Sequence, residues 1–204
     1  FEVGIDPEAF TRLDAIAGND CVQTYDSPEQ PEYAQRWIDM ALNYTLQRSV
    51  APASPVFNSE NHIITDGDTR FIPASHIRTA LWTQALHGQG ATTVWVWERA
   101  QGGDFAENIL TRAECVRALG RTALDLNRLG AEFHALQRVP SDLAILYASS
   151  SLLPSPAYAE EAAAAFEAAY FADVIPEFVT ERQVEAGALG RYRLVIVPHV
   201  THIP

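Results

Sequence analysis

The sequence contains no lysine, so arginine supplies all 14 of its basic residues against 26 acidic ones. The resulting net charge of −12 argues against a nucleic-acid partner, because nothing on this chain would neutralise a phosphate backbone. Long apolar runs are missing as well. No run approaches the ~20 residues that a membrane-spanning helix needs, so we expect no membrane protein.

Cysteine is scarce, with Cys21 and Cys115 the only two. Two cysteines cannot form a disulfide framework or a four-cysteine metal site. His62, Asp66 and Asp68 lie close together in the sequence, but their spacing matches no distinctive ligand pattern. The sequence therefore predicts neither a metal nor a cofactor.

The composition is that of a folded globular chain, with 48% apolar and 20% charged residues. Over residues 1–140, short apolar runs alternate with longer amphipathic stretches, which predicts an α/β fold with a parallel sheet and right-handed crossovers. The predicted strands are 13–18, 55–60 and 92–97; the predicted helices are 28–50, one that starts after Ser75 as its N-cap and ends at Gly88, and 111–136.

The pattern restarts after Pro140. The predicted elements there are strands at 143–147, 178–179 and 194–198 and a helix at 157–172. This alternation predicts a second, doubly wound domain that is incomplete. We therefore divide the chain into domains at 1–140 and 141–204.

Polar side chains follow the predicted strands of the first domain. In parallel α/β folds, functional groups lie at the carboxyl ends of strands, so these positions predict an active site. The candidates are Asn19 and Asp20 after the first strand, Glu60 and His62 at the second, and Trp97, Glu98 and Arg99 after the third.

Glu60 ends an apolar strand between small polar neighbours. One interpretation is a carboxylate that attacks an electrophilic carbon or moves a proton; the other is a strand-end carboxylate that caps a turn or pairs with an arginine. His62 equally could orient a substrate or be a structural hydrogen-bonding residue. Spacing alone leaves both questions open.

Trp95 and Trp97 are two residues apart, which predicts that they share one face of their strand. Such a pair could stack on the apolar face of a sugar ring, or either residue could fill the core. For Trp95 we favour the core, which leaves Trp97 as the substrate-binding candidate.

The order of these motifs resembles the carboxyl-terminal half of a glycoside hydrolase family 42 type β-galactosidase, followed by the start of that family's trimerisation domain. The segments that carry the resemblance are 13–20, 55–60, 85–88 (Ala-Leu-His-Gly), 96–103 with its Gly-Gly loop, 142–147 and 192–198. The resemblance implies the last strands of a (β/α)8 TIM barrel, followed by a partial flavodoxin-like domain.

The resemblance also implies a retaining glycosidase in which Glu60 is the nucleophile. A second carboxylic acid about 5 Å away would protonate the leaving oxygen, and in this family it follows the fourth strand, which the sequence does not contain. The expected partners are a carbohydrate substrate, the remainder of a longer parent chain, and further copies of that chain in a trimer. Any export signal would precede Phe1, so the compartment stays open, with a cytoplasmic location favoured.

Two segments depart from the family pattern. The Glu-x-x-His motif that contacts the sugar after the Gly-Gly loop is absent from 104–110, and the residues around Glu60 differ from the usual sequence. The family's zinc-binding cysteines also have no counterpart. The leading hypothesis is a glycosidase fragment for β-galactosides or related β-linked sugars that is inactive alone. The alternatives are a non-catalytic carbohydrate-binding or assembly protein, and an unrelated α/β domain with an ion network of Asp20, Glu60 and Arg99.

Overall fold

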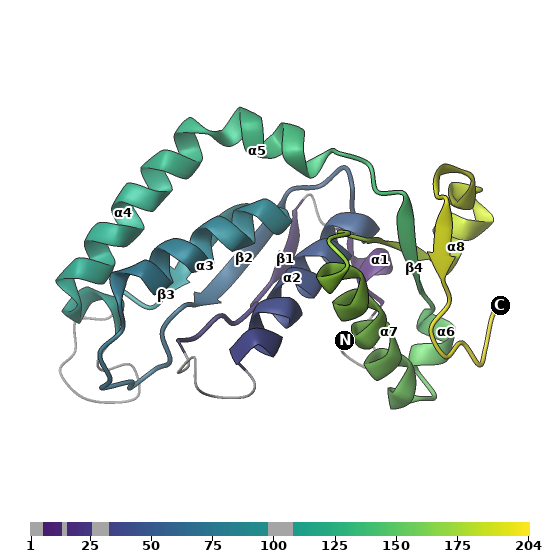
Figure 1. The fold of residues 1–204 in the computed structure, drawn as a ribbon, viewed down its shortest axis with the longest axis horizontal. Coiled ribbons are helices and arrows are strands. Elements are labelled where there is room, and N and C mark those ends of the chain that lie inside the picture. Colours follow the sequence, from purple (N-terminus) through teal and green to yellow (C-terminus); the bar gives the residue numbers. More distant parts are fainter. Residues whose placement is uncertain (1–5, 14–15, 26–32, 98–107) are drawn as a thin grey trace. The chain divides into compact units, whose positions relative to one another are not determined.

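The computed structural model describes residues 6–13, 16–25, 33–97 and 108–204 (Figure 1). The chain forms two compact units. The first unit consists of residues 18–44 and 56–139; the second consists of residues 1–17, 45–55 and 140–204. Among the described residues, no helix combines the length and hydropathy needed to cross a bilayer.

The first unit contains a three-stranded sheet in the order β1 (Ala17–Asn19), β2 (Val56–His62), β3 (Gln89–Trp95). Helix α2 (Tyr33–Val50) connects β1 to β2, and α3 (Ala74–His87) connects β2 to β3. Strands β2 and β3 pair in parallel. The predicted strand at 13–18 is wrong in extent: Leu13 lies in a turn and is exposed, so the strand starts only at Ala17.

Helix α3 begins at Ala74 with Pro73 at the N-cap position, so the prediction of Ser75 as N-cap is wrong. Proline is compatible with a helix start because its φ is already set near the helical value and it has no N–H to leave unpaired. The predicted end is confirmed: Gly88 adopts φ 125° at the C-cap, a conformation that glycine reaches without steric cost.

The predicted helix at 111–136 is two helices, α4 (Ala113–Arg128) and α5 (Gly130–Gln137), which follow the short 3-10 helix η1 (Ile109–Thr111). The break lies at Leu129, whose φ of −99° and ψ of 18° depart from helical values. Gly130 follows directly, and glycine has a low helix propensity. On this segment Phe133 is buried, and Leu119 and Leu126 pack partly buried against the core.

The core of the first unit lies between the loop after β2 and the helices α3 and α4. Fully burying one such aliphatic side chain stabilises the fold by about 1.5–3 kcal/mol. The cluster therefore holds the polar loop at 63–73 against both helices. Its buried members are Ile63, Ile64, Ile72, Ile77, Ala80, Leu81, Val94, Ile109 and Cys115.

The second unit contains a parallel sheet in the order β5 (Glu177–Thr180), β4 (Leu143–Tyr147), β6 (Leu194–Ile196). Helix α7 (Pro156–Phe171) lies between β4 and β5 in the chain. The sheet is accompanied by short helices: α1 (Pro7–Phe10), α6 (Ser149–Leu152), α8 (Glu181–Glu185) and the 3-10 helix η2 (Ala188–Arg191).

The alanine-rich helix α7 packs its large side chains inward. Tyr158, Ala162, Phe166 and Ala169 are buried, at the spacing of one helical face. The Phe166 ring stacks on that of Phe178 in β5, with centroids 6.0 Å apart and planes 5° from parallel. The small alanines leave room for these rings.

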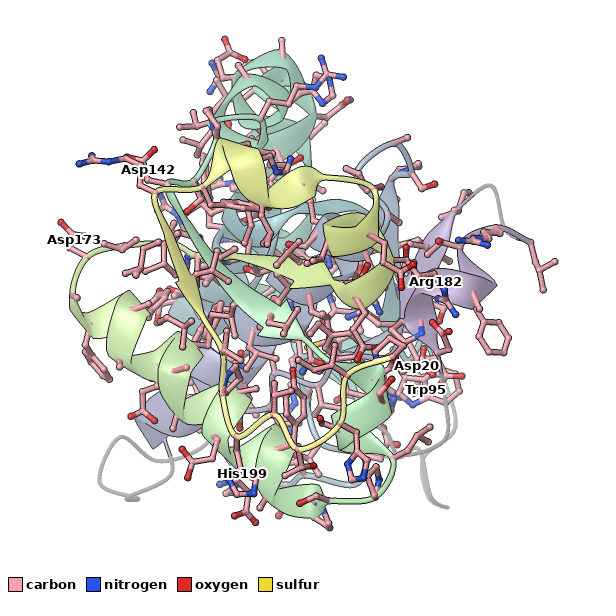
Figure 2. All side chains as sticks on the ribbon, turned by 90° about the vertical axis from the view of Figure 1, so that its right-hand side faces the viewer. Asp20, Trp95, Asp142, Asp173, Arg182 and His199 are labelled. Carbon is pink, nitrogen blue, oxygen red and sulfur yellow. The ribbon has the colours of Figure 1, made fainter. Side chains whose placement is uncertain are left out.

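Two segments from the amino-terminal part of the chain belong to the second unit. The Arg182 guanidinium, labelled in Figure 2, lies 2.6 Å from Asp6 at the start of α1. Ser49 near the end of α2 accepts the Phe178 N–H at its hydroxyl (3.0 Å), and its carbonyl accepts from the Gln183 side chain (2.9 Å). The second unit therefore consists of the chain from residue 140 onward together with two earlier segments, 1–17 and 45–55.

An α/β fold with parallel sheets is thus confirmed. Each sheet has three strands among the described residues, so the assignment to the last part of a TIM barrel and to a partial flavodoxin-like domain stays a prediction.

Candidate active site

Glu60 lies on β2, two residues before the strand ends, and not at its terminus as the apolar run suggested. Opposite it, the pairing with β3 shifts: Asn58 is paired with Thr92, but Asn61 is paired with Val94. Ser59 and Glu60 therefore face the single residue Thr93, which is a β-bulge. Bulges redirect side chains, and here the Glu60 side chain is 47% exposed.

His62 is the nearest described partner of Glu60. Its Nε2 lies 3.5 Å from a Glu60 carboxylate oxygen, and the imidazole is 22% exposed. The His62 ring also lies 5.5 Å from the Trp95 ring, centroid to centroid. His62 therefore contacts both the Glu60 carboxylate and the Trp95 indole at the carboxyl ends of β2 and β3.

Trp95 belongs to this cluster and is only partly buried. Its indole N–H donates to a carboxylate oxygen of Asp66, 3.3 Å away, in the loop after β2. The strand β3 ends at Trp95, two residues before Trp97. Alternation therefore does not continue to Trp97, and the prediction that both tryptophans share one strand face is wrong.

Asn19 is the last residue of β1, and Asp20 follows the strand, as predicted. Both approach β2 through Ser59. The Ser59 hydroxyl donates to an Asp20 carboxylate oxygen and lies 3.3 Å from the Asn19 carbonyl. The Asn19 side chain accepts the Cys21 N–H at 3.0 Å, which shapes the turn after β1.

Of the seven site residues predicted from the sequence, Asn19, Asp20, Glu60 and His62 gather at the carboxyl ends of β1 and β2. Glu98 and Arg99 lie outside the described residues. Trp97 is described, 46% exposed, and lines a different pocket.

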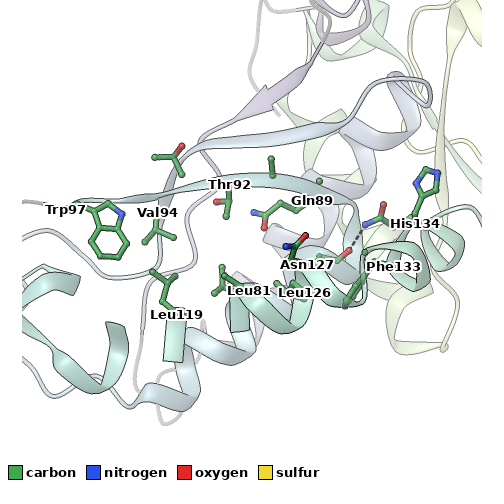
Figure 3. Close-up of a pocket in the computed structure, with 17 residues that line it drawn as sticks. Leu81, Gln89, Thr92, Val94, Trp97, Leu119, Leu126, Asn127, Phe133 and His134 are labelled. Atoms are coloured by element: carbon green, nitrogen blue, oxygen red, sulfur yellow. Dashed lines mark hydrogen bonds between the residues drawn. The ribbon is translucent and has the colours of Figure 1, made fainter. Parts of the chain in front are cut away.

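That pocket, of about 720 Å³, lies along β3 between α3, α4 and α5 (Figure 3). Trp97, Leu119, Leu126 and Phe133 give it a largely apolar wall, with Gln89, Asn127 and His134 among its polar residues. Neither Glu60 nor His62 lines it. The pocket is therefore separate from the group formed by Glu60, His62 and Trp95.

The loop that carries Asp66 is held by charged side chains. Arg70 contacts the buried Asp68 carboxylate with its Nε (2.9 Å) and Nη2 (2.6 Å). Arg112 at the start of α4 donates to the carbonyls of Asp68 and Arg70. The hydrogen bonds from Arg70 lower the pKa of Asp68 below its usual value, so Asp68 is an ion-paired carboxylate. Among the described residues, no group of three or more His, Cys, Asp or Glu side chains is arranged to hold a metal.

Sequence reasoning missed two features of this site. Asp66 was considered as a metal ligand, but it accepts the Trp95 indole N–H. The buried asparagines Asn58 and Asn61 on either side of Glu60 were not among the predicted site residues. Their spacing of three in an otherwise alternating strand was the available signal, because residues three apart lie on opposite faces of a regular strand.

The arrangement suits nucleophilic or acid–base chemistry. Glu60 offers a partly exposed carboxylate, and His62 can donate a hydrogen bond to it or to a ligand. The Trp95 ring supplies an apolar surface next to these polar groups. A ligand with both hydroxyl groups and apolar ring faces would fit this combination.

Comparison with solved structures finds the same fold in three glycoside hydrolase enzymes. The apo exo-carrageenase GH42 from Bacteroides ovatus superposes with a TM-score of 0.80 at 24% identity, over 96% of this chain and 28% of that one. A catalytic mutant of Gan42B, a GH42 β-galactosidase from G. stearothermophilus, superposes with a TM-score of 0.69 at 14% identity, over 95% of this chain and 30% of that one. The β-galactosidase of the Antarctic haloarchaeon Halorubrum lacusprofundi superposes with a TM-score of 0.55 at 18% identity, over 95% of this chain and 29% of that one.

These matches confirm the resemblance to family 42 at the level of the fold. The chain spans less than a third of the length of the enzymes it matches. No protein-family model matches the sequence, and no curated protein matches it significantly.

Proposed function

We propose that this chain, which shares the fold of part of the family 42 glycoside hydrolases, is the nucleophile-bearing part of a retaining glycosidase for β-galactosides or related β-linked sugars. One observation carries the proposal. Glu60 projects a partly exposed carboxylate from a bulge in β2, 3.5 Å from His62, whose ring in turn contacts Trp95, in a chain with this fold.

In the proposed reaction, a Glu60 carboxylate oxygen attacks the anomeric carbon. The bond from that carbon to the leaving oxygen breaks, and a carboxylic acid gives its proton to the leaving oxygen. Water then attacks the anomeric carbon of the glycosyl–Glu60 ester, and the bond from that carbon to the Glu60 oxygen breaks, which frees the Glu60 carboxylate. The residue that protonated the leaving oxygen, now a carboxylate, takes the proton from that water. Two inversions at the anomeric carbon give net retention.

The proton donor must come from polypeptide outside this chain. The resemblance places it after the fourth barrel strand, and the chain spans 28–30% of the matched enzymes. The active form is therefore proposed to be a longer parent chain, assembled as a trimer. Protonation of the leaving group is worth roughly 10²–10⁴ in rate, so the isolated chain should show no turnover.

The remaining site residues are proposed to bind the sugar. His62, Asn19 and Asp20 present hydrogen-bonding groups at the strand ends, and Glu98 and Arg99 follow β3 in the sequence. For the stacking role we propose Trp95, because its ring lies against His62. Trp97 lines the separate pocket along β3, so we propose that it contacts only a part of the ligand that lies away from Glu60.

A covalent trap tests the proposal. The full parent protein is incubated with a 2-deoxy-2-fluoro-β-galactoside that has a good leaving group, and its peptides are analysed by mass spectrometry. We expect one fluorosugar adduct on Glu60, no adduct in Glu60→Gln, and an unchanged adduct in Asp125→Asn, which removes an exposed carboxylate on α4 that is not part of the proposed site.

Three outcomes would contradict it: turnover retained by Glu60→Gln, an adduct on another carboxylate, or sugar binding with neither an adduct nor release of a reducing sugar. The last would identify the alternative, a non-catalytic carbohydrate-binding or assembly protein of the same fold.

A further inference from the structure

A connected set of polar side chains lies buried next to the Glu60 bulge. We refer to these residues as the amide network. Four of them are completely buried and Gln89 is 8% exposed. Its members are Tyr44 on α2, Asn58 and Asn61 on β2, Gln84 on α3, and Gln89 and Thr92 on β3.

Asn58 connects this network to Glu60. Its side-chain oxygen accepts the Glu60 backbone N–H at 3.2 Å. Its side-chain nitrogen donates to the Cys21 carbonyl (2.9 Å) and to the Tyr44 hydroxyl (2.8 Å). Gln89 donates to the same hydroxyl at 2.8 Å. Burial raises the pKa of Tyr44 well above its usual value, so the phenol stays neutral and can accept both bonds.

Asn61 forms the other branch. It exchanges two hydrogen bonds with the Gln84 side chain, at 2.7 and 3.0 Å, and donates to the Thr92 hydroxyl at 2.9 Å. The Gln89 side chain lies 3.3 Å from the Gln84 oxygen and connects the two branches. Glu60 is therefore flanked on both sides by asparagines anchored to helices α2 and α3.

The spacing of the two asparagines explains the bulge. Side chains three residues apart point to opposite faces of a regular strand, yet Asn58 and Asn61 both reach the same network. This requires one extra residue between them, and the register with β3 shifts between Asn58 and Asn61. The extra residue turns Ser59 and Glu60 away from the network.

We propose that the amide network holds this bulge and thereby sets the position of the Glu60 carboxylate, so that Asn58 and Asn61 are positioning residues. The inference rests on the function proposed for Glu60. Stability alone does not require these side chains, because a buried polar network replaced by apolar groups of similar shape is often no less stable. A regular apolar strand, however, would have no bulge at Glu60.

The test uses Asn58→Leu and Asn61→Leu in the full parent protein, assayed with an aryl β-galactoside. Displacing a reacting group by about 1 Å can cost roughly 100-fold in rate. We therefore expect kcat to fall by about that factor for Asn58→Leu, with KM changed by less than about threefold. The matched control is Gln137→Leu, which removes an amide bond to the Ala85 carbonyl on α3 (2.7 Å) but no network contact; its kcat should be unchanged.

A second readout separates positioning from general disruption. In Glu60→Gly, azide can attack the anomeric carbon in place of the missing carboxylate and form a glycosyl azide. Adding Asn58→Leu to this variant should leave the azide-rescued rate unchanged, because there is no carboxylate left to position. A rescued rate that falls as far as the kcat of the single variant would overturn the inference.

The outcomes also separate this inference from the proposed function. If Glu60→Gln is inactive and the wild type is trapped on Glu60, but Asn58→Leu keeps its kcat, only the positioning role fails. If Glu60→Gln remains active, the proposed function itself fails. Should Asn58→Leu not fold, Gln89→Met removes a more distant bond of the network, and an unchanged kcat there contradicts the inference.

Discussion

The carboxylate of Asp66 accepts the indole N–H of Trp95 at 3.3 Å, and this bond connects the loop after β2 to the last residue of β3. The two residues are 29 positions apart in the sequence. The indole plane next to His62 is therefore held from outside its own strand, and the loop in turn is held by Arg70 and Arg112. Each of these contacts leads to a measurable expectation.

Removing the Asp66 acceptor should weaken sugar binding. Asp66→Ala frees the indole to rotate, and a hydrogen bond to a charged group contributes about 1.5–3 kcal/mol. In the full parent protein, we expect the KM of Asp66→Ala for an aryl β-galactoside to be roughly tenfold that of the wild type, which corresponds to about 1.4 kcal/mol. Asp66→Asn keeps an oxygen acceptor and should have a smaller effect. The exposed neighbour Thr65 provides the control, since Thr65→Ala should leave KM unchanged; equal effects of both variants would contradict the assignment.

The Asp68–Arg70 pair should make the fold sensitive to acid. The pKa of Asp68 is lowered in the folded protein, so its stabilising contribution is complete above the unfolded value of 3.8 and is lost as the pH falls through the folded pKa. Asp68 is 4% exposed but Arg70 is 49% exposed, so solvent screening limits the contribution to about 1 kcal/mol. Urea unfolding at pH 6 and pH 2.5 should show a larger loss for the wild type than for Asp68→Asn.

The control for that experiment is Asp125, whose pair with Arg128 is exposed at both ends. Asp125→Asn should lose as much stability on acidification as the wild type does. A wild-type loss no greater than that of Asp68→Asn would show that Asp68 contributes nothing.

The Cys21 thiol should resist alkylation in the folded protein. Burial raises its pKa to about 12 from an ordinary 9.0, which lowers the thiolate fraction at pH 8 by about 10³. In Cys115→Ala, where Cys21 is the single thiol, iodoacetamide should modify the folded protein at least ~100-fold more slowly than the guanidinium-unfolded protein. Similar rates would mean that the thiol is accessible.

The Tyr158 hydroxyl should stabilise the second unit. It accepts the Ala148 N–H at 2.7 Å and donates to the Leu146 carbonyl, both buried. Tyr158→Phe leaves these two backbone groups without that partner, so we expect a loss of about 2–3 kcal/mol in the free energy of unfolding. Phe171 is 70% exposed on the same helix, and Phe171→Ala should change the free energy of unfolding by less than about 0.5 kcal/mol. Equal losses would point to a general effect of substitution on α7.

Much of the secondary structure could be predicted. The strand at 143–147 matches β4 residue for residue, and the helix at 157–172 matches α7 within one residue. Both are dominated by local signals: an apolar run bounded by polar residues, and an alanine-rich segment with high helix propensity. The predicted strand at 13–18 was wrong in extent, because strand pairing depends on tertiary contacts. The predicted unbroken helix at 111–136 was wrong at Leu129, where the low helix propensity of the adjacent Gly130 was a local signal that the prediction did not use.

The candidate site was predictable in part. The rule that functional groups follow parallel strands identified Asp20, Glu60 and His62, since strand ends can be read from the sequence. The sequence favoured Trp97 over Trp95 for stacking, because Trp95 was assigned to the core of a strand predicted to end at residue 97, whereas β3 ends at Trp95.

The amino-acid sequence by itself determined the fold class, the negative charge and the polar residues at the strand ends, because these depend on composition and on local periodicity. Only the tertiary structure decided which way Glu60 points and which tryptophan lies next to His62. The direction of a strand side chain depends on how the strand pairs and where it bulges. At Glu60 that pairing is accompanied by hydrogen bonds that Asn58 donates to Tyr44 and Asn61 donates to Gln84, while Gln89 donates to the same Tyr44 hydroxyl. These residues are distant in the chain and meet only when it folds.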